Sequence, residues 1–106
     1  MFKSAFIIMA PDGDPKKHRA TIKTGKAELT SVFIQLRNID QAVEVAKELV
    51  QNEGIQSIHL CPGFPHRAVA RIAAAVGDGV AVQVSRGDIP STQMVDEIVT
   101  REGWFD

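Results

Sequence analysis

Residues 57–71 read Ser-Ile-His-Leu-Cys-Pro-Gly-Phe-Pro-His-Arg-Ala-Val-Ala-Arg, and this stretch decides how the rest of the chain is interpreted. It begins with a short apolar segment, turns at prolines and a glycine, and continues into an amphipathic helical pattern. A strand that leads directly into a helix gathers backbone N–H groups and the positive end of the helix dipole, which suits an anion. The stretch therefore predicts a β-to-α unit and a place to look for a ligand.

Size and composition bound the possible functions. The chain has 106 residues, of which 44% are hydrophobic and 24% charged, and its formal net charge is −1. These values indicate one small globular domain over residues 1–106. Because the net charge is close to zero, we expect neither nucleic acid nor a membrane surface as a partner. The single cysteine, Cys61, can form no internal disulfide, so we expect a reducing, cytoplasmic compartment.

The first part of the chain predicts a buried central strand. The apolar run of residues 5–10 is followed by a Pro-Asp-Gly-Asp-Pro turn and not by a small-residue cleavage site, so we do not interpret it as a leader. Pro15 could open a short helix over residues 15–19, and the polar segment 21–28 predicts a loop. Apolar side chains alternate between two faces over residues 29–36, as in a strand with one exposed face.

Helical patterns separate the remaining strands. Asn38 is an expected N-cap with Gln41 in the capping-box position, and Gly54 ends that helix. A second helix follows Pro65, and a third over residues 91–102 is expected to turn four apolar residues inward: Met94, Val95, Ile98 and Val99. Residues 56–61 and 80–85 form the third and fourth strands. The second and fourth strands are half-polar, so we expect them at the two edges of the sheet.

This alternation predicts an α/β three-layer sandwich with four mostly parallel strands in the order 2-1-3-4, a shortened flavodoxin-like sheet with three or four helices. An antiparallel pairing of the first two strands would shift the class toward α+β. In such sheets a ligand lies beyond the carboxyl ends of the strands. We therefore expect a ligand site at that edge, made by six residues: Asp12, Cys61, Gly63, His66, Arg67 and Arg86.

Structural roles compete with a functional one at these positions. Cys61 can be a packed strand-end residue, and His66 and Arg67 can be solvated. However, cations in a first helical turn oppose the helix dipole, which favours an anionic partner. The spacing of His and Cys residues predicts no metal, and no cofactor is expected.

Cys61 and Arg67 are separated by five residues, a spacing that resembles cysteine-dependent phosphatases and sulfurtransferases. That resemblance implies Cys61 as a catalytic nucleophile and Arg67 as an anion clamp. The match is incomplete, because prolines 62 and 65 remove two backbone donors and Ala68 replaces the usual hydroxyl residue. Whether the protein is an enzyme stays open, with a binding module preferred and a non-catalytic oligomeric or partner-binding protein as the third alternative.

Several segments together resemble a small uncharacterised bacterial α/β family of about this length. They are Ala-Phe-Ile-Ile-Met-Ala-Pro at residues 5–11, Asp-Pro-Lys-Lys-His-Arg at 14–19, the helix of residues 42–50, and Leu-Cys-Pro-Gly-Phe at 60–64. The resemblance implies the fold and no activity. Open sheet edges and the Trp104–Phe105 tail additionally predict a homodimer that covers an edge or the tail.

Overall fold

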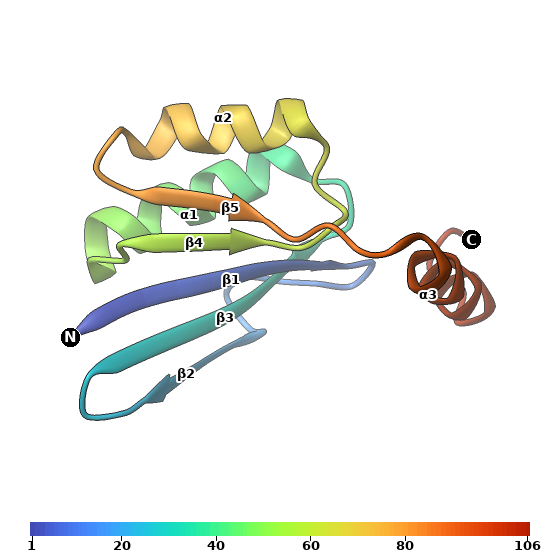
Figure 1. The fold of residues 1–106 in the computed structure, drawn as a ribbon, viewed down its shortest axis with the longest axis horizontal. Coiled ribbons are helices and arrows are strands. Elements are labelled where there is room, and N and C mark those ends of the chain that lie inside the picture. Colours follow the sequence, from blue (N-terminus) through green and yellow to red (C-terminus); the bar gives the residue numbers. More distant parts are fainter.

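The computed structural model describes residues 1–106 and contains five strands and three helices (Figure 1). The strands are β1 (Phe2–Ala10), β2 (Arg19–Lys23), β3 (Ala27–Gln35), β4 (Ser57–Leu60) and β5 (Ala81–Val84). The helices are α1 (Ile39–Glu53), α2 (His66–Val76) and α3 (Ile89–Arg101).

All five strands form one sheet in the order β2-β3-β1-β4-β5. β1 pairs in parallel with both β3 and β4, and β4 pairs in parallel with β5. β3, β1, β4 and β5 correspond to the four predicted strands, in the predicted order. The expected mostly parallel α/β fold is therefore confirmed, with five strands instead of four.

The additional strand corrects two expectations about residues 15–28. No helix forms over residues 15–19: His18 N donates to the carbonyl oxygen of Asp14 at 2.8 Å within a turn. The expected loop at 21–28 is confined to residues 24–26, because β2 pairs antiparallel with β3 in a hairpin. The hydroxyl groups of Thr21 and Thr30 lie 2.9 Å apart across this pair, so polar side chains help to hold it. As a result, β3 is not an edge strand.

The predicted ends of α1 are confirmed. Asn38 Oδ1 accepts a hydrogen bond from Gln41 N at 3.0 Å, and Gly54 ends the helix with φ of 72°. The side chain of Gln41 departs from a standard capping box, because its Oε1 accepts from Gln35 N at 2.7 Å. The helix start is thus tied to the end of β3.

The hydrophobic core lies on one face of the sheet. Every buried apolar strand residue points to that face: Ala5, Ile7, Met9, Val32, Ile34, Ile58 and Leu60. α1 and α2 both lie on this side in Figure 1, and Arg71 of α2 pairs with Asp40 of α1 at 2.8 Å. The two helices therefore form one layer over the buried face. The third layer that the sequence predicts is not formed, because the remaining helix, α3, does not cover the opposite face.

α3 lies away from the sheet, beyond the carboxyl ends of the strands (Figure 1). Its apolar residues Met94, Val95 and Ile98 are 63%, 55% and 42% exposed, so the expectation that they point inward is wrong. The extended segment 85–88 leads the chain past the sheet before the helix begins. None of the three helices has the length and apolar character needed to cross a membrane.

Candidate functional site

The candidate site lies at the edge of the sheet where the parallel strands end, and we call this edge the rim. Cys61 follows β4 and Arg86 comes two residues after β5, while Asp12 lies in the turn after β1. Because β1, β4 and β5 run parallel, the chain leaves all three at the same edge. The topology thus places the predicted site residues in one region.

A tight turn connects β4 to α2. Phe64 N donates to the carbonyl oxygen of Cys61 at 3.2 Å, so Pro62 and Gly63 occupy the two central positions. The Phe64 side chain is fully buried and anchors the turn in the core. A Cβ atom on Gly63 would lie 3.3 Å from Met9 Sδ, so this position has little room for a side chain. The turn is therefore fixed by both its backbone and its aromatic residue.

Arg86 joins this turn to the end of β5. Its Nη1 donates to the carbonyl oxygen of Pro62 at 2.9 Å, and its Nη2 donates to that of Phe64 at 2.8 Å. The same Nη2 lies 3.5 Å from His66 Nδ1, at the first residue of α2. The structure thus brings together Arg86, His66 and the turn that begins at Cys61, which are separated in the sequence.

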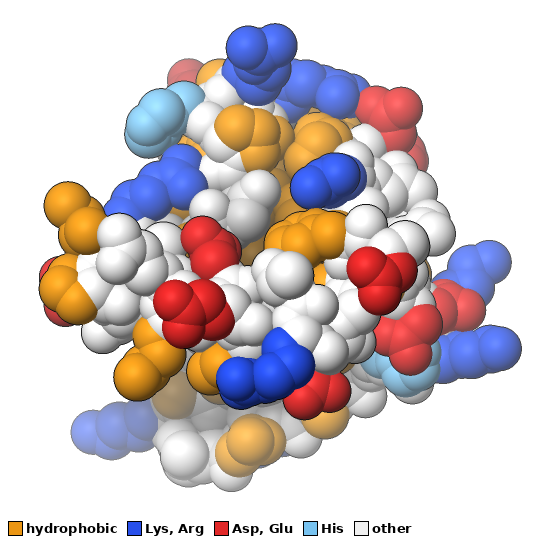
Figure 2. All heavy atoms as spheres, turned by 90° about the vertical axis from the view of Figure 1, so that its right-hand side faces the viewer, with side chains coloured by type: hydrophobic (Ala, Val, Ile, Leu, Met, Phe, Trp, Pro, Cys, Tyr) orange, Lys and Arg blue, Asp and Glu red, His pale blue; other side chains and the backbone are white.

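The start of α2 carries positive charge without a counter-ion. Pro65 occupies the N-cap and gives no side-chain hydrogen bond, and the first turn contains no acidic residue. The backbone N–H groups of His66 and Arg67 precede the first intrahelical donors, and no carboxylate pairs with the Arg67 guanidinium. At the top of Figure 2, where α2 lies in Figure 1, basic side chains and a histidine are at the surface, with acidic side chains to the right. This arrangement can attract an anion.

Two further predicted site residues, Cys61 and Asp12, make no side-chain contact with Arg86 or His66. Cys61 is only 7% exposed, and its thiol is free. Asp12 is exposed, and no hydrogen bond or ion pair connects it to Arg86 or His66. The neighbouring Asp14 stabilises its own turn, because its Oδ1 accepts from Lys16 N at 2.9 Å. Asp12 therefore stays a predicted ligand residue that contacts neither Arg86 nor His66.

Sequence reasoning missed the anchoring role of Phe64 and the position of Arg19. A Pro-Gly turn followed by an aromatic residue was the available signal for Phe64. Arg19 lies beside α1, where it pairs with Glu48 at 3.3 Å and with Glu53 at 2.9 Å. Nothing in the local sequence indicated these two partners, which come from a helix 29 and 34 residues further along the chain.

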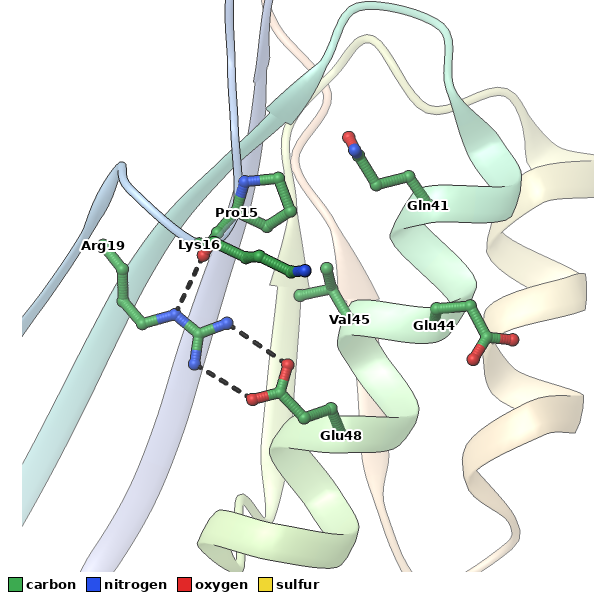
Figure 3. A pocket seen from close by; sticks show the side chains of 7 residues that line it. All are labelled: Pro15, Lys16, Arg19, Gln41, Glu44, Val45 and Glu48. Atoms are coloured by element: carbon green, nitrogen blue, oxygen red, sulfur yellow. Dashed lines mark hydrogen bonds and ion pairs between the residues drawn. The ribbon is translucent and has the colours of Figure 1, made fainter.

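The Arg19 pair borders a surface hollow of about 370 Å³ between the β1–β2 connection and α1 (Figure 3). Seven residues line it: Pro15, Lys16, Arg19, Gln41, Glu44, Val45 and Glu48. Figure 3 shows the guanidinium of Arg19 directed at the carboxylate of Glu48. Since these charges satisfy each other, the hollow is a weaker candidate for a ligand than the rim. No group of three His, Cys, Asp or Glu residues is arranged to hold a metal ion.

Comparison with known proteins gives a family without an assigned activity. Neither the curated proteins nor the solved structures contain a match to this chain. The model of a family of unknown function, DUF6506, matches residues 2–100 and so covers the sheet, the rim and almost all of α3. The chain therefore belongs to the DUF6506 family, in agreement with the small α/β family that its sequence resembles.

Proposed function

We propose that the protein is a binding module that holds a small anionic ligand at the rim, between the first turn of α2 and Arg86. The observation that carries this proposal is the position of Arg86, which fixes a guanidinium beside His66 at a helix start. Arg67 adds a second cation without a carboxylate partner, and two backbone N–H groups are free to donate. An anion here would interact with the helix dipole, these N–H groups and the cations together.

The same geometry favours binding over cysteine-dependent catalysis. A nucleophilic thiolate must reach its substrate, whereas Cys61 is almost completely buried. Pro62 and Pro65 supply no N–H group, and the N–H of Phe64 already donates within the turn. Few donors are thus left to cradle an oxyanion around the sulfur, and we infer no catalytic role for Cys61.

Thermal unfolding in phosphate, sulfate or small carboxylates tests the proposal, with sodium chloride at equal ionic strength as reference. A ligand at about 100 times its Kd stabilises the native state by about 2.7 kcal/mol. Arg67→Ala should abolish the anion-dependent rise in Tm, while Cys61→Ser should retain it. Arg71→Ala is the matched control, since Arg71 lies on the same helix but pairs with Asp40. An unchanged Tm in every anion, or an unchanged response in Arg67→Ala, would contradict the proposal.

A second candidate function, self-association as a cytoplasmic homodimer, is favoured by the surface of the protein. Ten large hydrophobic residues are exposed: Met1, Phe2, Ile22, Leu29, Phe33, Ile89, Met94, Val95, Ile98 and Phe105. Contiguous exposed apolar surface in a stable protein marks interaction sites. The free thiol of Cys61 supports a reducing compartment. Sedimentation equilibrium at tens of micromolar, roughly the range of modest interfaces, should give a dimer, and a monomer would reject this candidate.

A further inference from the structure

The face of the sheet opposite α1 and α2 is apolar and uncovered. Its side chains include six large hydrophobic residues, which we call the open face: Phe2, Phe6, Ile8, Ile22, Leu29 and Phe33. All charged residues of the strands that make it point to the other side: Lys3, Arg19, Lys23 and Glu28. A sheet face that meets water normally carries polar side chains, and parallel sheets are normally covered on both faces. The open face therefore lacks its covering layer.

α3 presents the complementary surface. Met94, Val95, Ile98 and the half-buried Val99 share one side of this helix, and we call them the α3 stripe. Ile89 lies off this stripe, on the opposite side of the helix. Figure 2 faces the α3 end of the molecule and shows hydrophobic side chains at the surface beside acidic ones. The chain thus has one sheet face, the open face, that no helix covers, and one helix, α3, that packs on no sheet.

The charges around these two surfaces are opposite. Residues 15–26 form and flank β2, at the margin of the open face, and contain five cations and no carboxylate: Lys16, Lys17, Arg19, Lys23 and Lys26. Arg19 and Lys23 point to the covered face and pair with carboxylates there, so Lys16, Lys17 and Lys26 are the cations without a carboxylate partner at this margin. Residues 88–106 contain five carboxylates and one cation: Asp88, Asp96, Glu97, Glu102 and Asp106 against Arg101. An acidic α3 on the open face would therefore lie near three unpaired lysines, which favours association and sets its orientation.

The open face also contains a hollow that can accept a side chain. It measures about 300 Å³ and is lined by His18, Arg19, Ala20, Ser31 and Phe33. Three of these residues, Ala20, Ser31 and Phe33, point to the open face according to the register of β2, β3 and β1. Apolar interface anchors are typically seated in such pockets.

Contacts within the chain hold α3 away from its own open face. Arg86 is bound to the turn before α2, and Ser85 N donates to the carbonyl oxygen of Leu60 at 2.9 Å. At the other end of the helix, the guanidinium of Arg37 lies 5.5 Å from the centre of the Phe105 ring. Both ends of α3 are thus attached at the rim, where a second molecule can reach the helix.

We propose that two copies of this chain associate reciprocally, with the α3 stripe of each covering the open face of the other. This proposal specifies the interface of the self-association candidate and rests on it. Seven of the ten exposed large hydrophobic residues lie on these two surfaces, namely Phe2, Ile22, Leu29, Phe33, Met94, Val95 and Ile98. At roughly 100 Å² for each half-exposed side chain, they offer about 700 Å² per chain, near the ~800 Å² per partner of a standard interface. Exchange of the same two surfaces closes a twofold dimer without leaving either one free.

Light scattering during gel filtration of full-length variants tests the interface. The wild type should be a dimer, and the double variant Val95→Glu/Ile98→Glu should be a monomer with an unchanged circular dichroism spectrum, because both side chains are exposed in their own chain. Phe33→Glu should also give a monomer, with Leu29→Lys as a second open-face variant in case the first unfolds. Ile89→Glu, which alters an exposed residue off the stripe, should stay dimeric. A monomeric wild type would overturn the self-association itself, whereas a dimeric Val95→Glu/Ile98→Glu protein would overturn only this interface.

Mixing the two monomeric variants separates reciprocal exchange from other arrangements. A heterodimer of Val95→Glu/Ile98→Glu with Phe33→Glu keeps one intact pair, the wild-type α3 of one chain on the wild-type open face of the other. The mixture should therefore recover dimer with at least about tenfold tighter association than either variant alone. If two open faces or two α3 helices paired with each other, every mixed dimer would retain a damaged surface on one side. Absence of recovery would overturn the proposal, as would an α3 that covers the open face of its own chain in a monomer.

Discussion

Arg86 Nη2 donates to the carbonyl oxygen of Phe64 at 2.8 Å, so a residue after β5 fixes the turn that precedes α2. This contact spans 22 residues of sequence and is made to a backbone atom. Because Phe64 is itself fully buried, the guanidinium is held at a defined place above the core. The rim thus has a guanidinium in a defined position at its β5 end, beside the start of α2.

Replacing Arg86 with lysine should loosen the rim while preserving its charge. A lysine ammonium cannot donate to two carbonyl oxygens in the fork geometry of a guanidinium. We expect Arg86→Lys to lower the free energy of unfolding by about 1 kcal/mol, measured by urea denaturation. Arg67→Lys is the control, because Arg67 makes no such contact, and it should leave the urea midpoint unchanged. Equal midpoints for wild type and Arg86→Lys would show that the two hydrogen bonds contribute nothing to stability.

Gly13 should tolerate no side chain. A Cβ atom at this position would collide with the carbonyl oxygen of Ile34, at the end of the neighbouring strand β3. We expect Gly13→Ala to destabilise the protein by about 1–3 kcal/mol, since backbone must move to make room. Gly25→Ala is the matched control, because a Cβ atom there would meet no atom within 4 Å. If both variants unfold at the same urea concentration, the close approach at Gly13 does not constrain the fold.

The strand order and the ends of α1 could be predicted because their signals are local. Residues 5–10 form an apolar run typical of a central strand, and Asn38 and Gly54 are capping residues in their usual positions. β2 could not be predicted in the same way, since Ile22 is its only large apolar residue. Its stability comes from pairing with β3, a tertiary contact that local propensity does not encode.

The position of α3 could not be predicted for a different reason. Helical periodicity correctly places Met94, Val95 and Ile98 on one side of a helix, but it does not specify what covers that side. At the rim, the topology predicts that Cys61 and Arg86 lie in the same region. The contacts of Arg86 were not predictable, because backbone carbonyl acceptors have no signature in the sequence.

Phe64 should be the residue of the turn on which stability depends most. Its side chain is fully buried, whereas the ring of Phe105 is half exposed. We expect Phe64→Ala to lower the free energy of unfolding by about 3–5 kcal/mol, and Phe64→Leu to cost less because leucine fills part of the cavity. Phe105→Leu should change it by less than about 0.5 kcal/mol. Urea denaturation measures these differences. A Phe64→Leu protein as stable as the wild type would contradict the anchoring role of Phe64.

Alkylation of Cys61 with iodoacetamide should be slow in the native protein. The thiol is almost completely buried, so the reagent needs a local opening of the turn before it can react. We expect the native rate to be at least about tenfold below that of the same chain in denaturant, since accessibility limits the reaction of a packed cysteine. Cys61→Ala confirms that any label is attached at this position.

Sulfate should slow the alkylation of Cys61 further if an anion bound at the rim stabilises the closed turn, while Arg67→Ala should remove that protection. A native thiol that reacts as fast as the denatured one would restore the cysteine-dependent alternative, because only an accessible sulfur can attack a substrate.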